Sequence, residues 1–367
     1  MLRLRADAAA PGEKDQIVTE FQDPFLELVR LVREASEIEH ALLVQYLFAG
    51  FSVRPRYQLL VGGGFPASAS NFLGVAVQEM HHLNAVNELL MALGASPNLL
   101  SQDFPYEPDI YPFPFNLEPL SRKSVAKYVW AEAPAGDPFL EKLTDELGDV
   151  HPNHLGSLYA TIIDTVEKVI AAPPSPSLDL SSWPARLAAI KDEGEHDHFE
   201  FFAAVFDGTH PGFDGQADVW KLDKSDPNYP AFDFPVNPTA FIRRPGSIPD
   251  AKAAGVAWLA DLHYWIVLAL LDLGYRHSSP TALFHAKSHM TGPLLSLGKH
   301  LATLGSGTSF DSLSMGYNLG RTHEDSVRIL GRLLGEAGVE TEKLRPDLPA
   351  GYPFTQIQRT VTALPQL

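Results

Sequence analysis

One predicted helix, residues 71–93, carries two ionisable side chains within an otherwise apolar stripe. Residues three and four positions apart lie on the same face of a helix. The stripe defined by this spacing reads Phe72, Val75, Glu79, His82, Val86, Leu89 and Leu93. Burying a carboxylate without a partner is costly. This helix must therefore pack against elements that compensate Glu79 and His82.

Two other predicted helices raise the same problem. In the helix predicted for residues 24–50, Glu39 lies midway along the apolar stripe. In the helix predicted for residues 183–206, His198 lies on the inner stripe and Glu195 borders it. Three helices therefore present inward Glu or His side chains at mid-length. A divalent ion in the core of a helical bundle would compensate all of them together.

The remaining sequence also reads as helical. Apolar periodicity, capping residues and Gly or Pro breakers predict helices over residues 24–50, 71–93, 121–133, 154–171, 183–206, 251–273, 280–304 and 321–337. Gly50 and Gly94 are the expected ends of the first two, and Gly292-Pro293 is expected to interrupt the seventh. No strand pattern persists, so we predict an all-α protein with a four-helix bundle.

The predicted organisation has five parts. We expect a disordered leader at 1–20, a four-helix bundle at 21–207, an irregular linker at 208–250, a C-terminal helical module at 251–345 and an irregular tail at 346–367. The proline-rich aromatic stretch 97–119 cannot form a long helix, and we expect it to pack over the bundle. The apolar run 253–275 contains Asp261, His263 and Asp272, which favours a buried helix over a membrane span.

Composition narrows the chemistry of any site. The chain has no cysteine, which excludes disulfides, iron–sulfur clusters and thiolate ligands. A metal site must then use histidine and carboxylate ligands, which suit iron, manganese or zinc. The formal net charge of −17 argues against a nucleic-acid partner. We expect a cytoplasmic protein that acts on a small molecule and does not bind membranes.

Glu-x-x-His spacing occurs four times, whereas chance gives roughly one such pair. The four pairs are Glu37/His40, Glu79/His82, Glu193/His196 and Glu195/His198. We expect the third pair on the surface because its helical stripe is polar. Glu37/His40 lies off the apolar stripe, and His40 is expected to support a ligand or face solvent. A separate pair, His285/His289, has helical spacing but is expected to be solvated.

Several segments resemble the ferritin-like domain of iminophenylpyruvate dimer synthases, enzymes of violacein- and rebeccamycin-type bisindole biosynthesis. The matching segments are Glu39–Leu47, Gln78–Leu83, Leu93–Pro97, Leu117–Ser121, Ala131–Pro134, Leu155–Tyr159, Glu193–Glu195 with His198-Phe199, and the region of Tyr264 and Met290–Leu297. The likeness covers roughly residues 20–310. It implies a ferritin-like fold with a metal centre of carboxylate and histidine ligands.

Transferred residue by residue, the resemblance supports the metal ligands Glu39, Glu79, His82, Glu195 and His198. A two-iron site also requires a glutamate from the third helix, where this chain has Ser157. Asp164 and His154 are the available substitutes, and neither lies on the apolar stripe. One ion held by three to five ligands and two ions both remain open. Tyr46 and Tyr159 are expected to be partners of the ligands.

Four functions fit these features to different degrees. An oxidoreductase would use iron, with manganese or zinc as alternatives, on a small substrate derived from an aromatic amino acid. A metal-storage protein fits less well, because the long loops and C-terminal module disfavour a cage. A metal-free scaffold would explain Ser157 but would leave buried charges unpaired. A zinc hydrolase lacks a His-Glu-x-x-His run. The apolar C-terminal helices are also compatible with a homodimer.

Overall fold

The computed structural model describes residues 17–63, 68–101, 116–148, 153–216, 218–312, 318 and 320–367. These residues are all-α and contain no β-strand, as the sequence predicted. Two isolated bridges join Val53 to Ala231 and Thr239 to Ser247. Most of the expected leader and the aromatic residues Phe104 to Phe115 lie outside the described residues.

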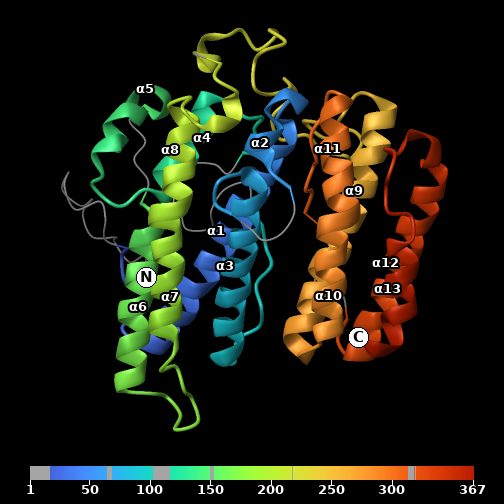
Figure 1. Ribbon diagram of the computed structural model, residues 1–367. Helices are drawn as coiled ribbons and strands as arrows, with labels where there is room; N and C mark the ends of the chain where they lie inside the picture. Colours follow the sequence, from blue (N-terminus) through green and yellow to red (C-terminus); the bar gives the residue numbers. More distant parts are fainter. Residues whose placement is uncertain are drawn as a thin grey trace.

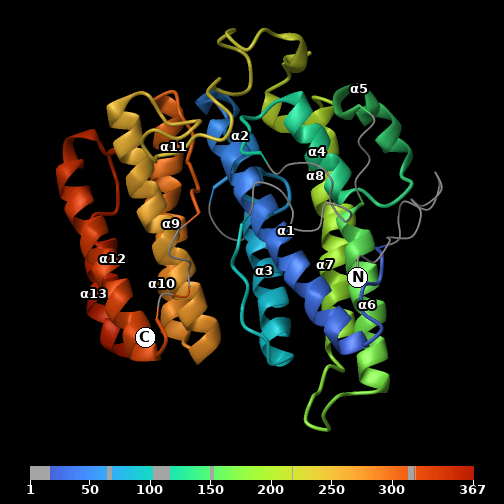
Figure 2. The same cartoon turned by 180° about the vertical axis from the view of Figure 1, so that it is seen from behind.

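The helices form two bundles that lie side by side (Figures 1 and 2). The first contains α1 (Pro24–Ser52), α2 (Gln58–Val61), α3 (Phe72–Ala92), α4 (Arg122–Glu132), α5 (Thr144–Leu147), α6 (Leu155–Ala171), α7 (Trp183–Asp192) and α8 (Phe199–Phe206). The second contains α9 (Ala251–His277), α10 (Pro280–His289), α11 (Leu295–Thr303), α12 (His323–Lys343) and α13 (Gln356–Ala363). The irregular segment between α8 and α9 crosses one end of the molecule.

Local sequence accounts for the ends of α1 and α3. The Asp23 side chain accepts hydrogen bonds from the backbone N–H groups of Phe25 and Leu26, and therefore caps α1 as predicted. Gly94 has a φ of 78°, in the left-handed region that ends helices. The prediction for Gly50 was wrong, because α1 continues to Ser52.

Gly50 serves helix packing instead. A Cβ atom there would lie 2.9 Å from the Cβ of Phe72 on α3. The missing side chain allows α1 and α3 to pack closely along their length.

The third position of the first bundle is filled by two helices. α6 packs against α1 and α7, whereas α4 packs against α8. The fourth position is one long helix, in which the π-helical turn Glu193–His198 separates α7 from α8. The predicted third helix, 154–171, matches α6. The structure adds α4 as a further helix that packs on the core of this bundle.

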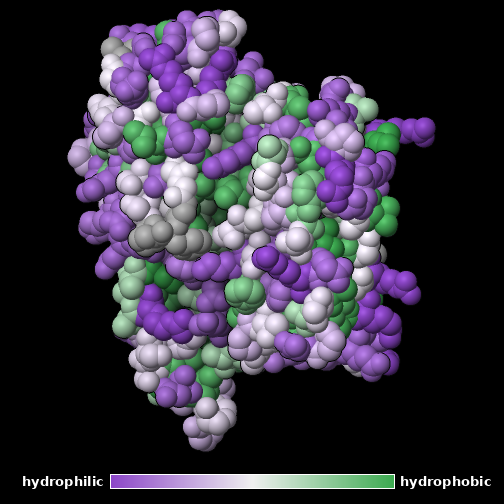
Figure 3. Space-filling model, turned by 45° about the vertical axis from the view of Figure 1, so that its right-hand side comes forward, coloured by the Kyte–Doolittle hydropathy of each residue, from purple (hydrophilic) through white to green (hydrophobic). Residues whose placement is uncertain are grey.

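The second bundle surrounds α9. This helix is long and apolar enough to cross a membrane, but 78% of its most apolar window is buried inside the protein. It is therefore a core helix, as the sequence predicted. On the face in Figure 3, hydrophilic residues predominate and hydrophobic ones form small separate areas, as expected of a soluble protein. A π-helical turn, Met290–Leu294, interrupts the predicted helix at Gly292-Pro293.

Two predictions about the second bundle were wrong. The tail after Pro346 was expected to be irregular, but it contains α13, which packs on α10 and α12. His285 and His289 were expected in solvent, but they are 8% and 0% exposed. Both rings hydrogen-bond to the Thr360 hydroxyl of α13, at 3.1 and 2.9 Å. These contacts stabilise a helix too short to persist alone.

Candidate metal centre

Four of the five predicted ligands converge in the core of the first bundle. Glu39 lies on α1, Glu79 and His82 lie on α3, and His198 ends the π-helical turn. Their exposures are 0%, 0%, 3% and 0%. The structure adds Glu132, the last residue of α4, which is 1% exposed.

These five residues form two groups that share one carboxylate. The first group is Glu39, Glu79 and His82, and the second is Glu79, Glu132 and His198. Within each group, one ligand atom per residue lies within 4.8 Å of the others. Glu79 thus lies between two positions, each of which has two carboxylates and one imidazole.

Distances show how Glu79 connects the two groups. Its Oε2 lies 3.2 Å from Nδ1 of His82, which is also 3.6 Å from Oε2 of Glu39. Its Oε1 lies 2.9 Å from Nδ1 of His198, which is also 3.7 Å from Oε2 of Glu132. Each histidine therefore directs Nδ1 at two carboxylates.

Several of these atoms have no hydrogen-bond partner among the described residues. The buried atoms without one include Glu39 Oε2, Glu79 Oε1, Glu132 Oε2 and both ring nitrogens of His198. The 2.9 Å approach of His198 to Glu79 is therefore close, but its angles are unsuitable for a hydrogen bond. Buried polar atoms are nearly always paired in folded proteins. A metal ion bound between these converging oxygen and nitrogen atoms would satisfy them.

Two tyrosines hold the other oxygens of these carboxylates. The Tyr159 hydroxyl donates to Oε1 of Glu39, and the Tyr46 hydroxyl donates to Oε1 of Glu132 at 2.5 Å. The sequence had predicted these two tyrosines as partners of the ligands. In each case the tyrosine fixes one oxygen and leaves Oε2 unpartnered.

Burial and charge set the protonation of the cluster. Burial, with the nearby charge of Glu79, raises the pKa of Glu39 to about 8. Burial alone would raise the pKa of Glu79, but the charges of His198 and His82 lower it below its usual range. Burial would lower the pKa of His198, yet Glu79 and Glu132 raise it to about 10. Without an ion, the protein thus balances buried carboxylates with protonated histidine.

Glu132 was missed, although its helix carries a signal. Val125, Tyr128, Val129 and Glu132 follow helical spacing on one buried stripe. Glu132 supplies the carboxylate that the sequence analysis sought at Ser157. The proposed substitutes do not, because Asp164 is exposed and His154 contacts the Trp130 carbonyl at 2.8 Å.

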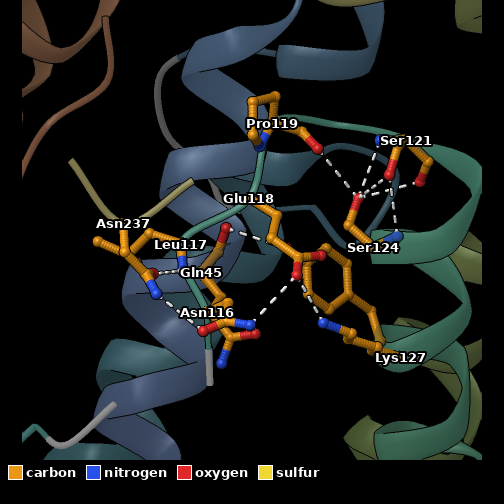
Figure 4. A network of polar contacts seen from close by, with 10 residues as sticks. Gln45, Asn116, Leu117, Glu118, Pro119, Ser121, Ser124, Lys127 and Asn237 are labelled. Carbon is orange, nitrogen blue, oxygen red and sulfur yellow. Dashed lines mark hydrogen bonds and ion pairs between the residues drawn. The ribbon is translucent and has the colours of Figure 1, made fainter. Parts of the chain in front are cut away.

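A polar network fixes the position of α4 (Figure 4). Ser121 and Ser124 form a reciprocal capping box at its first turn. The Lys127 ammonium lies 2.8 Å from the Glu118 carboxylate. The Asn237 side chain accepts from the Leu117 N–H at 2.7 Å. These contacts anchor the segment before α4 and hence the direction of Glu132.

The carboxylate nearest His82 on the fourth helix is Glu193. Its Oε2 lies 2.7 Å from Nε2 of His82, and its Oε1 accepts from the Gln78 amide. The hydrogen bond to His82 lowers the pKa of Glu193. The surface position predicted for this pair holds for His196, which is exposed. Glu193 is half-buried: its side chain is 32% exposed, but its carboxylate is directed inward to His82.

Glu195, the fifth predicted ligand, is not brought into either group. Its Oε2 lies 2.5 Å from the Lys191 ammonium. It occupies space beside Gly156, where a Cβ atom would lie 2.0 Å from its Oε1. The prediction assumed α-helical geometry, in which Glu195 and His198 share a face. In the π-helical turn, bonding spans five residues, so Glu193 and His198 come to the same side instead.

Gly194 and His40 also shape the surroundings of the cluster. A Cβ atom on Gly194 would lie 2.9 Å from Oε2 of Glu132, so glycine leaves room for this carboxylate. His40 was expected to support a ligand or face solvent, but it is 2% exposed. Its Nε2 lies 2.8 Å from the Tyr264 hydroxyl of α9, which connects the two bundles.

Comparison with known proteins agrees with the helical fold. A family model described as Ferritin-like matches residues 32–175, which contain most of α1 and all of α3, α4 and α6. This part of the chain is thus similar to ferritin-like domains, and the all-α, ferritin-like fold predicted from the sequence is confirmed.

The chain is also similar to a particular enzyme, dichlorochromopyrrolate synthase of Lentzea aerocolonigenes. The identity is 27% over 220 residues, which cover 52% of this chain and 20% of that protein. The chain therefore matches about a fifth of the length of this curated relative. No solved structure matches the chain.

Proposed function

We propose that this protein is a metal-dependent oxidoreductase that binds iron in the cluster of Glu39, Glu79, His82, Glu132 and His198. The observation that carries the proposal is the set of orphaned carboxylate oxygens and imidazole nitrogens converging in a buried core. A ligand set of carboxylates and imidazoles without thiolate suits iron, and manganese or zinc also fit. The two groups sharing Glu79 support two ions per chain.

The chain's own residues prepare this site in three ways. Tyr159 and Tyr46 each hold one carboxylate oxygen and leave the other directed at the cluster. Burial excludes water and strengthens the electrostatic interactions of the ligands. Bound iron would supply one-electron redox chemistry, with dioxygen or a peroxide as the terminal oxidant.

We propose a small substrate derived from an aromatic amino acid. Support comes from the similarity to dichlorochromopyrrolate synthase and from the resemblance of the sequence motifs to those of iminophenylpyruvate dimer synthases. An oxidative coupling would remove two electrons and two protons from a pair of substrate molecules, and the oxidant would accept them. The alternative is a ferritin-like scaffold that binds metal without turnover or binds none.

The first test is metal content. Purified protein is loaded anaerobically with Fe²⁺, desalted and analysed for iron, alongside Glu79→Gln. We expect close to two iron ions per wild-type chain and a loss of most iron in the variant, because Glu79 belongs to both groups. Circular dichroism confirms that both proteins are folded.

The outcomes separate the hypotheses. A folded wild type that retains no iron, manganese or zinc would refute metal dependence and leave the scaffold. One ion per chain would refute the dinuclear centre. If iron binds, admission of dioxygen should cause oxygen uptake measurable with an electrode. A bound Fe²⁺ that remains unoxidised in air would argue against an oxidoreductase.

A further inference from the structure

We propose that Glu193 is the residue that positions His82 for metal binding, and that the π-helical turn assigns this role to Glu193 rather than to Glu195. The inference rests on the proposed metal-binding function. It concerns a residue that helical spacing places on the surface.

The hydrogen bonds of His82 define the role. Its Nδ1 is directed at Glu79 and Glu39, so Nδ1 is the nitrogen available to an ion. Its Nε2 then carries the proton, which it donates to Oε2 of Glu193 at 2.7 Å. A carboxylate on the second nitrogen fixes the tautomer and ring orientation of a metal-binding histidine and increases its basicity.

Glu193 is itself held in place. The Gln78 amide, one turn before His82 on α3, donates to its other oxygen. Both carboxylate oxygens of Glu193 are thus engaged by α3, and neither metal-ligand group includes this residue. This arrangement separates Glu193 from the ligands and makes it a positioning residue.

The neighbouring Glu195 provides the contrast. It is paired with Lys191 and lies against Gly156 of α6, and neither metal-ligand group includes it. The two glutamates lie on the same turn and have the same chemistry, so each serves as the control for the other.

His198, the histidine of the other ligand group, has no carboxylate partner of this kind on its second ring nitrogen. No hydrogen bond reaches its Nε2 from the described residues. The two ion positions are therefore unequal, because His82 has a carboxylate partner and His198 does not. Loss of Glu193 should weaken the position at His82 selectively.

The experiment is a Co²⁺ titration of the metal-stripped full-length chain, followed by visible absorption in competition with a chelator. The variants are Glu193→Ala, Glu193→Gln and the matched control Glu195→Ala. Glu193 is partly exposed, so water can reach the vacated space and the variant should fold. We expect Glu193→Ala to weaken one Co²⁺ about 10- to 100-fold and the other by no more than about threefold.

The other variants sharpen the result. Glu193→Gln keeps an acceptor for the Nε2 proton but loses the charge, so its effect should be intermediate. Glu195→Ala should change both affinities by no more than about threefold. In the zinc-loaded wild type, ¹⁵N spectra of the His82 ring should show a proton on Nε2 only, and Glu193→Ala should shift that resonance.

Three results would overturn the inference. A larger loss in Glu195→Ala than in Glu193→Ala would return the role to Glu195. Equal weakening of both ions in Glu193→Ala, or no weakening, would refute selective positioning while leaving the proposed function intact. A wild type that binds no Co²⁺ or Fe²⁺ would refute the proposed function and this inference together.

Discussion

At the scale of single residues, the proposed metal centre depends on carboxylates that have a hydrogen-bond partner on only one oxygen. Glu39 and Glu132 each receive one tyrosine hydroxyl and keep one buried oxygen without a partner. A fully satisfied carboxylate would have little need of an ion, and a wholly unsatisfied one would destabilise the fold. The tyrosines therefore reduce the energetic cost of burying these carboxylates and leave one oxygen of each available as a ligand.

Replacing Tyr159 with phenylalanine tests this dependence. The substitution removes the hydrogen bond to Oε1 of buried Glu39, whose Oε2 already lacks a partner among the described residues. We expect the free energy of unfolding of the metal-free protein to fall by about 1–3 kcal/mol. Urea denaturation followed by circular dichroism measures it. Tyr128→Phe is the control, because that hydroxyl makes a long 3.4 Å bond to the Gln45 carbonyl. If both variants lose the same free energy of unfolding, the Tyr159–Glu39 hydrogen bond contributes no more to stability than the bond of Tyr128.

At this scale the sequence predicted four of the five residues that cluster in the core, but not the fifth. Glu39, Glu79, His82 and His198 were recognised because each interrupts or borders an apolar stripe. Glu132 follows the same rule, yet its helix is short and was not assigned to the core. Whether a residue on a stripe faces a particular partner depends on how helices are placed, and spacing along one helix does not contain that information.

At the scale of elements, glycines set how closely helices approach one another. Gly298 of α11 faces Phe51 of α1, and a Cβ atom there would lie 2.3 Å from the phenyl ring. Gly335 of α12 is exposed and has no atom within 4 Å of its Cβ position. The same residue type thus serves packing at one site and has no packing role at the other.

Alanine substitutions at these two glycines should change stability in opposite directions. Gly298→Ala should destabilise by about 1–3 kcal/mol, because the methyl group must displace Phe51 or separate the helices. Gly335→Ala should stabilise by about 0.5–1 kcal/mol, because alanine favours the helix. Thermal unfolding measures both. A stabilising effect of Gly298→Ala would mean that α1 and α11 do not pack as described.

The limits of prediction at this scale have a common cause. The helix 183–206 was predicted correctly in extent, but not its π-helical turn, because one inserted register change leaves the overall apolar pattern almost intact. Because of that turn, Glu193 lies beside His82, and Glu195 is directed away to Lys191. Helix α13 was missed because eight residues between prolines have little helical tendency of their own. Both features are decided by tertiary contacts.

At the scale of the whole molecule, the second bundle supports the first. His40 of α1 contacts Tyr264 of α9, and Phe51 of α1 lies against α11. The long helix α1 therefore contributes to both bundles, with Glu39 on its inner side and His40 next to it. Loss of the second bundle's structure would be expected to disturb α1 and hence the proposed metal ligand Glu39.

The core of the second bundle contains a directed chain of hydrogen bonds. Thr360 donates to the Gln356 carbonyl and therefore accepts from Nε2 of His289 at 2.9 Å. Nδ1 of His289 then accepts from Nδ1 of His263 at 2.9 Å, and Nε2 of His263 accepts from the Tyr352 hydroxyl at 2.7 Å. Both histidines are neutral in this arrangement. Burial, with His289 nearby, lowers the pKa of His263 well below its ordinary value. Burial, with His285 nearby, lowers the pKa of His289 to about 3.

These two histidines should make the molecule sensitive to acid. Their unfolded pKa is about 6.5, so below this pH the unfolded chain binds protons that the folded chain excludes. Stability is therefore fully present above about pH 7 and is lost as the pH falls toward the folded pKa. Each histidine contributes a slope of up to about 1.4 kcal/mol per pH unit. Urea denaturation of the metal-free protein at several values between pH 7.5 and 5 measures the slope.

The variant His289→Gln isolates this contribution from other titrating groups. Buried Asp261 acts in the opposite direction, because burial raises its pKa and favours the folded state at low pH. Comparing the variant with the wild type cancels that effect. Whatever its stability at pH 7.5, the variant should lose less stability on acidification, because it has one histidine fewer to protonate on unfolding. Parallel slopes in the two proteins would show that His289 is protonated in the folded state, which would contradict the neutral chain linking α9, α10 and α13.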